Sequence, residues 1–142
     1  MNLRQLLEER AHAHPDDTAV IISDRALTWA ELDRLANRAA QTMAAGGLGP
    51  GDRVAVMLPN CWEFMALFAG AAKLGAVIVP VNVHLRGEGL HHVLAHSEAS
   101  LLVLDAPLEP VVDRAGPPGL ARLVRGPGLD ATLAAATGAP PP

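Results

Sequence analysis

The sequence predicts an α/β fold in which a largely parallel sheet is flanked by helices and preceded by an early β-hairpin. The main observation lies between Gly51 and Asn82, where a short apolar run, a longer one and a second short one are separated by turn residues. These runs have the lengths of strand, helix and strand, and a crossover of this length is what two parallel neighbours require. Half of the residues are hydrophobic but only 3% are aromatic. Ala, Leu and Val must therefore fill the core, which favours close packing of helices on a sheet.

Length and charge exclude several classes of protein. A chain of 142 residues is long enough for one domain with a hydrophobic core. The formal net charge of −4 leaves no basic face for a phosphate backbone, so we expect no nucleic-acid binding. Cys61 is the single cysteine, so no intramolecular disulfide can form, and the first residues are charged without a long apolar run. We therefore expect a cytoplasmic protein with neither a signal peptide nor a membrane span.

Upstream of the strand-helix-strand unit, the sequence predicts a helix, the β-hairpin and a second helix. Thr28 and Glu31 have the three-residue spacing of a capping box at the start of the second helix. Apolar residues then recur at helical spacing until Gly46 and Gly47 end the helix. The predicted ranges are Leu3 to Ala13 for the first helix, Ala19 to Ile22 and Ala26 to Thr28 for the hairpin, and Thr28 to Met43 for the periodic part of the second helix.

Within the unit, the first strand is short and almost wholly apolar, so we expect it to be buried on both faces. Asn60 is predicted to cap the following helix, with Glu63 reaching back in a capping box. That helix carries charge only at Glu63 and Lys73, so it must be covered on more than one side. Gly75 ends it, and a second buried strand follows. The predicted ranges are Arg53 to Leu58, Trp62 to Leu74 and Ala76 to Val79.

Downstream of the unit, the sequence predicts a helix, a buried strand and a short helix, which has Pro107 in its first turn and ends at Gly116. Beyond Gly116 the chain is rich in Pro and Gly, so we expect it to be mostly loop or disordered, with at most a short strand and a helical turn. The chain therefore divides into a partial domain of residues 1–115 and a linker or tail of residues 116–142. The predicted ranges are Glu88 to His96 and Leu101 to Leu104 before the tail, and Ala121 to Val124 and Leu129 to Ala136 within it.

Catalytic motifs are largely missing from the sequence. Gly47 to Gly51 holds closely spaced glycines, but it precedes a strand, whereas a phosphate-binding loop links a strand to a helix N-terminus. A plain turn is therefore favoured over a phosphate loop. The sequence has neither a Walker-type Gly-Lys-Ser/Thr element nor a Gly-x-Ser-x-Gly nucleophile elbow. No residue is predicted to be catalytic.

The histidines and the cysteine each allow two interpretations. His92 and His96 are four residues apart on a predicted helix, with His84 and His91 nearby, and this spacing can present two imidazoles to one metal ion. No third ligand is placed beside them, so an exposed polar face is favoured and no metal site is predicted. Cys61 would have a lowered thiol pKa if it were exposed in a first helical turn, but burial of its side chain is favoured.

Three segments of the sequence resemble one family, in the right order and at matching intervals. They are LTWAELDRLANRAA, GDRVAVMLPNCWEFMALFAGAAKLGAVIVPVN and LRGEGLHHVLAHSEASLLVLD. These segments resemble the early core of the AMP-forming acyl-CoA synthetases, which are adenylate-forming ligases. The resemblance covers nearly the whole chain, but only the front part of that family's large N-terminal domain.

This resemblance implies an enzyme of fatty acid metabolism in which a carboxylic acid and ATP form an acyl-AMP, and the thiol of coenzyme A then displaces AMP. ATP, Mg²⁺ and coenzyme A are thus implied for the complete relative. The family's Ser/Thr/Gly-rich phosphate loop, its aromatic-Gly-x-Thr-Glu motif and its lid lysine have no counterpart between Met1 and Pro142. The resemblance therefore implies no cofactor-binding residue in this segment, and no adenylation activity for this chain alone.

The residues that match the family pattern have architectural explanations as caps, turns and contacts between elements. In some members the loop equivalent to His84 to Gly87 lies near the nucleotide end of coenzyme A, but neither His84 nor Arg86 is assigned a contact. Gly89 departs from the pattern, which usually has Glu there, and it weakens the first turn of its helix. The matching residues are Thr28, Glu31, Asn37, Arg38, Gly51, Asp52, Arg53, Pro59, Asn60, Glu63, Lys73, Gly75, Pro80 and Asn82.

Three functions follow from these observations. The favoured one is the N-terminal fragment of an AMP-forming carboxylic acid–CoA ligase, inactive alone. The second is half of a split ligase that a partner chain completes, and the third is a non-catalytic scaffold or binding module. The apolar helix from Trp62 to Leu74 is expected to lose part of its cover with the missing segments, so we also expect self-association.

Overall fold

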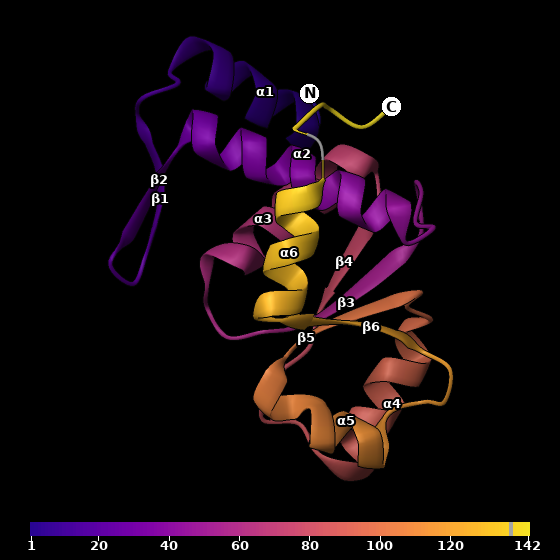
Figure 1. Cartoon of the computed structure of the whole chain (residues 1–142). Coiled ribbons are helices and arrows are strands. Elements are labelled where there is room, and N and C mark those ends of the chain that lie inside the picture. Colours follow the sequence, from indigo (N-terminus) through magenta and orange to yellow (C-terminus); the bar gives the residue numbers. More distant parts are fainter. Residues whose placement is uncertain (137) are drawn as a thin grey trace.

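The computed structural model describes residues 1–136 and 138–142. Helices and strands alternate along most of the chain (Figure 1). The predicted α/β class is confirmed. In chain order the elements are α1 (Leu3–Ala13), β1 (Thr18–Ile22), β2 (Arg25–Thr28), α2 (Trp29–Ala45), β3 (Arg53–Met57), α3 (Trp62–Leu74), β4 (Val77–Pro80), α4 (Gly87–Ser97), β5 (Leu101–Asp105), the 3₁₀ turn η1 (Ala106–Leu108), α5 (Glu109–Ala115), β6 (Ala121–Arg125) and α6 (Pro127–Ala135).

Four strands form a parallel sheet in the order β4-β3-β5-β6. The first of them in the chain, β3, lies inside the sheet, where Val54 pairs with Ile78 of β4 on one side and with Leu101 of β5 on the other. Strands β1 and β2 form a separate antiparallel hairpin, which projects beside α2 in Figure 1. All four parallel strands therefore point their carboxyl ends toward one edge.

Helices cover both faces of the sheet, because successive side chains of a strand point to opposite faces. Val54 and Val56 face α2, α3 and α6, whereas Ala55 and Met57 face α4 and α5. All four of these side chains are fully buried. Figure 1 shows the same division, with α4 and α5 on one side of the strands and the other helices on the opposite side. The expectation that the first strand is buried on both faces is confirmed.

Helices α2 and α3 pack most closely at Gly70. A Cβ atom at Gly70 would lie 2.7 Å from the Cβ of Ala39 and 2.9 Å from the carbonyl oxygen of Ala36. Small residues on both helices allow this approach, and Leu7 of α1 adds a third layer over them. In the described part of the chain, no helix is both long and apolar enough to cross a bilayer.

Helix α2 begins with the predicted capping box. The backbone N–H of Glu31 donates to the Thr28 hydroxyl at 3.2 Å, and the N–H of Thr28 donates to the Glu31 carboxylate at 2.8 Å. Two backbone donors that helix geometry leaves unpaired are thus satisfied together. The Thr28 N–H is the main cause of a lowered pKa for Glu31.

Two expectations for the central unit are corrected, and a third, that helix α3 loses part of its cover, is met only at Phe68, which is 37% exposed. Helix α3 is preceded by Cys61, with no side-chain cap, so the Asn60 capping box is absent and Asn60 is exposed. Strand β4 is one residue later than predicted and is not buried, because it is an edge strand whose Val77 is 47% exposed. Helix α3 keeps most of its cover, since α1, α2 and the sheet bury its face around Leu67 and Gly70.

Most of the segment that was expected to be loop or disordered has regular structure. Strand β6 pairs in parallel with β5 along its full length, and the predicted short strand is thereby confirmed. Helix α6 places Leu129 and Leu133 in the core on the α2 side of the sheet. Residue 137 of the predicted tail lies outside the described residues. Pro and Gly bound these two elements instead of preventing them, since Pro127 stands in the first turn of α6.

Candidate functional site

The carboxyl edge of the sheet is the first place to look for a site, because open α/β sheets bind ligands beyond the carboxyl ends of their strands. Two hollows open there. One, of about 530 Å³, lies between the segments that follow β3 and β4. The other, of about 440 Å³, lies between the hairpin and the start of α3. Phe64 borders both, and the remaining lining residues are Leu58, Pro59, Asn60, Pro80, Val81, Asn82 and Val83 in the first and Val20, Ile21, Ile22, Ser23, Asn60, Cys61 and Met65 in the second.

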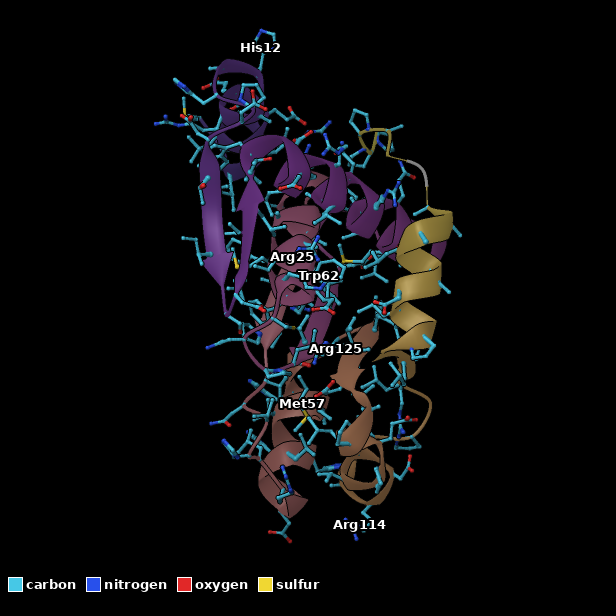
Figure 2. The ribbon with its side chains drawn as sticks, turned by 60° about the vertical axis from the view of Figure 1, so that its left-hand side comes forward. His12, Arg25, Met57, Trp62, Arg114 and Arg125 are labelled. Carbon is cyan, nitrogen blue, oxygen red and sulfur yellow. The ribbon has the colours of Figure 1, made fainter. Side chains whose placement is uncertain are left out.

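A charged cluster at the same edge ties α3 to the last two strands. Arg125 at the end of β6 contacts the Glu63 carboxylate through Nε at 3.2 Å and the Asp105 carboxylate through Nη1 at 3.1 Å. Burial alone would lower the pKa of Arg125, but the hydrogen bond and charge of Glu63, followed by Asp105, raise it. Figure 2 shows Arg125 below Trp62, whose ring lies 4.7 Å from the guanidinium carbon of Arg25. No sequence pattern predicts this cluster, because its members are distant in the chain.

Cys61 lies beside this cluster and is buried, as expected from its position. Burial raises the pKa of the Cys61 thiol, and the neighbouring Glu63 carboxylate raises it further, while the Phe64 backbone N–H partly opposes them. A thiolate is therefore disfavoured, and so is nucleophilic chemistry at this sulfur. Within the described residues, one buried carboxylate oxygen of Glu63, Oε2, has no hydrogen-bond partner.

The histidines of α4 form a polar outer face. The rings of His92 and His96 stack with centroids 5.4 Å apart, and Nδ1 of His91 lies 3.0 Å from the Ala115 carbonyl oxygen. His84 is exposed in the loop before α4. Residues 1–136 and 138–142 bring together no group of three or more His, Cys, Asp or Glu side chains that could hold a metal ion. The arrangement favours the interpretation as an exposed polar face.

The glycine-rich segment from Gly47 to Gly51 lies at the opposite edge of the sheet, before β3. Its Gly49 N–H donates to the Asp52 carboxylate at 2.8 Å, and its Gly51 N–H donates to the Gly75 carbonyl at 2.9 Å. These contacts join the turn to the end of α3. The segment therefore acts as a turn, and the predicted order of loop and strand is confirmed.

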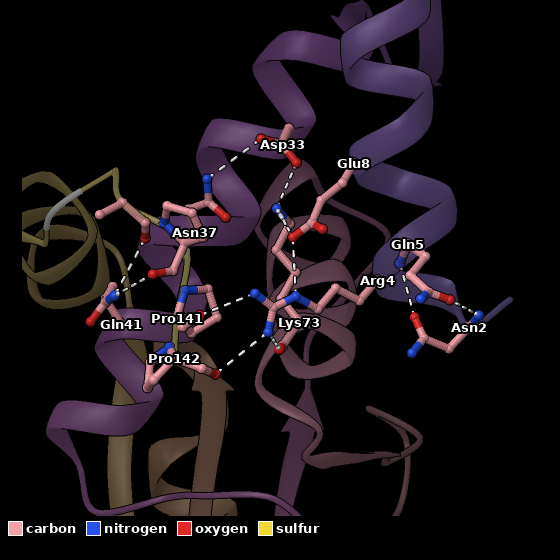
Figure 3. Close-up of polar contacts among 12 residues, drawn as sticks. Asn2, Arg4, Gln5, Glu8, Asp33, Asn37, Gln41, Lys73, Pro141 and Pro142 are labelled. Carbon is pink, nitrogen blue, oxygen red and sulfur yellow. Dashed lines mark hydrogen bonds and ion pairs between the residues drawn. The ribbon is translucent and has the colours of Figure 1, made fainter.

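A second charged cluster lies between the three helices α1, α2 and α3 (Figure 3). Nζ of Lys73 is 2.6 Å from Oδ1 of Asp33 and 3.5 Å from Oε1 of Glu8, and the Lys73 side chain is only 1% exposed. From the sequence, Lys73 is a charged residue of an apolar helix and matches the family pattern, but no partner is predicted for it. The signal that could have predicted the cluster was a lysine in an otherwise apolar helix, because a buried ammonium group requires an acidic partner.

The acidic side chains at the carboxyl edge do not fit a magnesium site. Glu63 and Asp105 both contact Arg125, whose single positive charge offsets one of their two negative charges, and no third acidic ligand joins them among the described residues. Nor does a loop of phosphate-binding type stand between any of the parallel strands and its following helix in the sequence. Within the described residues, this edge therefore presents two hollows and an ion cluster of one guanidinium and two carboxylates.

Solved structures with the same fold define the class of protein. The N-terminal domain of FACL13 from Mycobacterium tuberculosis superposes with a TM-score of 0.91 and 36% identity over 99% of this chain and 38% of that one. A fatty acyl CoA synthetase structure from the same organism has a TM-score of 0.90 over 99% of this chain and 29% of that one, also at 36% identity. The fold is thus that of the N-terminal domain of acyl-CoA ligases.

The family follows from the sequence comparison. The family model described as AMP-binding enzyme matches residues 7–137, and the chain belongs to this family. It is 40% identical over 124 residues to the long-chain-fatty-acid–CoA ligase FadD13 of Mycobacterium tuberculosis strain H37Rv. The aligned part makes up 83% of this chain and 25% of that ligase. It is 39% identical over 115 residues to a crotonobetaine/carnitine–CoA ligase of Salmonella typhimurium, covering 78% and 22%. The chain therefore spans about a quarter of the length of these relatives, and the resemblance seen in the sequence is confirmed.

Proposed function

We propose that this chain is the N-terminal part of an ATP-dependent, AMP-forming carboxylic acid–CoA ligase and that it has no adenylation activity alone. The observation that carries the proposal is the match of 99% of the chain to an acyl-CoA ligase N-terminal domain at a TM-score of 0.91. The complete enzyme would use ATP, Mg²⁺ and coenzyme A with a carboxylic acid substrate. The proposed location of this enzyme is the cytoplasm.

The expected inactivity has a structural reason. Adenylation requires groups that balance the charge of the transferring phosphate, supplied by loop amides, a metal ion and a cation. The cations near the sheet do not meet this need, because Arg125 is held by Glu63 and Asp105, and Lys73 is enclosed by Asp33 and Glu8 on the far side of α3. The segment therefore contributes a scaffold to which the remaining parts of a ligase would be joined.

A chimera tests the proposal directly. The present chain would replace the aligned segment of the long-chain-fatty-acid–CoA ligase FadD13, and ATP–pyrophosphate exchange would be measured with fatty and aromatic acids. We expect exchange by the chimera and none by the chain alone. The matched control is the same chimera with Arg10→Ala, because Arg10 is an exposed residue of α1. It should show the same exchange as the chimera.

The outcomes separate the two halves of the proposal. Exchange by the isolated chain would contradict its inactivity. A chimera that folds and binds no ATP or acid would contradict its role as the front part of a ligase. Addition of the remaining part of FadD13 as a separate chain tests the split-ligase alternative, which no observation now favours over the fragment.

A further inference from the structure

The last described residues, Gly138 to Pro142, lie across helices α1 and α2. Figure 1 shows this segment passing over α2 toward the N-terminal end of α1. Pro141 is buried there, although its two neighbours are exposed. The surface that receives this segment is formed by Arg4 of α1 and by Asn37 and Gln41 of α2, and it is called the α1/α2 groove below. It is distinct from the hollows at the carboxyl edge of the sheet.

Each of the five successive main-chain oxygens from Gly138 to Pro142 accepts a hydrogen bond from a side chain of the groove (Figure 3). Asn37 donates to Gly138 at 3.0 Å. Gln41 donates to the next two oxygens, at 3.3 and 3.4 Å. Arg4 donates to the last two, through Nη2 at 3.1 Å and Nη1 at 3.5 Å. Among the described residues, the hydrogen bonds from Arg4, Asn37 and Gln41 to this segment all go to its carbonyl groups.

This pattern of donors matches the chemistry of proline. A proline residue has no backbone N–H, so a proline-rich segment offers only acceptors to its surroundings. Pro141 is the buried residue of the segment, and its carbonyl faces Arg4, whose side chain has donors only. A residue with a backbone N–H at this position would gain no acceptor from Arg4, whereas proline needs none. Proline also fixes φ, so little conformational freedom is lost when the segment is bound.

Arg4 is also held by two contacts outside the segment. Its Nε donates to the Glu8 carboxylate at 3.1 Å, and its Nη1 donates to the Lys73 carbonyl at 3.2 Å. Glu8 in turn lies 3.5 Å from the buried Nζ of Lys73. The guanidinium is therefore anchored to two helices, which limits the entropy lost when it contacts the segment.

We propose that the α1/α2 groove is a binding site for proline-rich peptide segments, occupied within the chain by Gly138 to Pro142 and able to bind such a segment in trans. The cis segment acts as a tethered competitor, because tethering gives it a high effective concentration at the groove. This inference does not depend on the proposed ligase role.

Fluorescence anisotropy tests the proposal with a labelled, amidated peptide of sequence Gly-Ala-Pro-Pro-Pro. In the chain with Pro140→Gly, Pro141→Gly and Pro142→Gly, called the tail variant, we expect the cis segment to be released, and every groove residue is kept. We expect this tail variant to bind the peptide saturably and the unaltered chain to bind it at least about tenfold more weakly, as tethering predicts. A peptide of sequence Gly-Ala-Ala-Ala-Ala should bind at least about fivefold more weakly than the proline peptide.

Variants of the groove are made on the tail variant and checked for folding by circular dichroism. Arg4→Ala and Gln41→Ala should each weaken peptide binding at least about threefold, as the loss of a hydrogen bond implies. Gln41 lies at the surface, so Gln41→Ala leaves the core intact. Arg10→Ala, on the same helix as Arg4, should leave binding unchanged. Absence of saturable binding by the folded tail variant would overturn the proposal, and so would equal binding by the tail variant and the unaltered chain.

Discussion

Gly70 is the residue at which two helices approach most closely, and no larger side chain fits there. In Gly70→Ala the new Cβ would lie 2.7 Å from the Ala39 side chain and 2.9 Å from backbone atoms of α2. Because the backbone of α2 cannot move aside without disturbing the sheet beneath it, we expect a loss of about 1–3 kcal/mol in the free energy of unfolding. Urea denaturation followed by circular dichroism measures this change.

Gly89→Ala is the matched control for that prediction. Gly89 is exposed in helix α4, and its nearest neighbour to a new Cβ is a flexible leucine tip at 3.8 Å. Alanine should therefore stabilise this helix by about 0.5–1 kcal/mol. Equal effects at the two glycines would show that the close contact of α2 and α3 does not limit stability.

Lys73 is the buried cation that joins three helices. In Lys73→Met the carboxylates of Asp33 and Glu8 lose their positive partner, while the volume of the side chain is nearly kept. Asp33 is largely enclosed, so we expect a loss of about 3 kcal/mol in the free energy of unfolding. Arg53→Met, which removes an exposed ion pair with Glu98, should change that free energy by less than about 1 kcal/mol. A Lys73→Met protein as stable as the unaltered chain would show that the cluster contributes no net stability.

At the scale of elements, the capping box of α2 predicts a pH dependence. The Thr28 backbone N–H is the first cause of the lowered pKa of Glu31, so the folded state favours the ionised carboxylate. Its stabilising effect is therefore present above the ordinary pKa of a glutamate and is lost as the pH falls through the lowered folded-state pKa. We expect Glu31→Gln to be less stable than the unaltered chain at pH 7, and the difference to be smaller at about pH 3, which lies below the ordinary glutamate pKa of about 4.3.

Urea denaturation at both pH values measures this difference. Glu9→Gln serves as the control, since Glu9 is an exposed residue of α1. It should show no comparable change with pH. A difference between Glu31→Gln and the unaltered chain that is the same at both pH values would rule out the carboxylate as its cause.

Helix α6 contributes to the core, although it lies within residues 116–142, which were predicted to form a linker or tail. The division of the chain at residue 115 stays a prediction. Leu129 is fully buried between α2 and the sheet. Leu129→Ala should lower the free energy of unfolding by about 2–5 kcal/mol through the loss of buried surface and the cavity left behind. Leu3→Ala, at an exposed position of α1, is the control and should have little effect. Full stability of Leu129→Ala would support a tail that is independent of the domain.

At the scale of the whole molecule, self-association remains a prediction, with a new structural basis. Helix α3 is largely covered, but Ile21 of the hairpin is 68% exposed and Val77 of the edge strand β4 is 47% exposed. An unpaired, apolar edge strand is a site of pairing between chains. We expect light scattering at high concentration to give a mass above 14.8 kDa, and Val77→Lys to lower it more than Leu6→Lys on α1. A monodisperse monomer would contradict this expectation.

Local patterns were sufficient to predict most of the elements. Thr28 with Glu31, and the apolar run from Trp62 to Leu74, predicted two helices correctly because the spacing itself carries the information. The same reasoning failed at Asn60, since an N-cap depends on the path of the chain, and at β4, since burial depends on whether another strand lies beside it. The clusters around Arg125 and Lys73 join residues distant in sequence, so no spacing could have revealed their partners.

The order of the strands has a consequence for how the chain acquires its structure during synthesis. Strand β3 leaves the ribosome before both of its neighbours in the sheet, and the core on its α2 side includes Leu129 and Leu133, which are synthesised later still. A nascent chain that lacks α6 therefore exposes the apolar side chains of α2 and β3. Such surfaces are bound by chaperones and are prone to aggregation. Slow translation just before α6 would prolong this exposure, whereas slow translation after it would not.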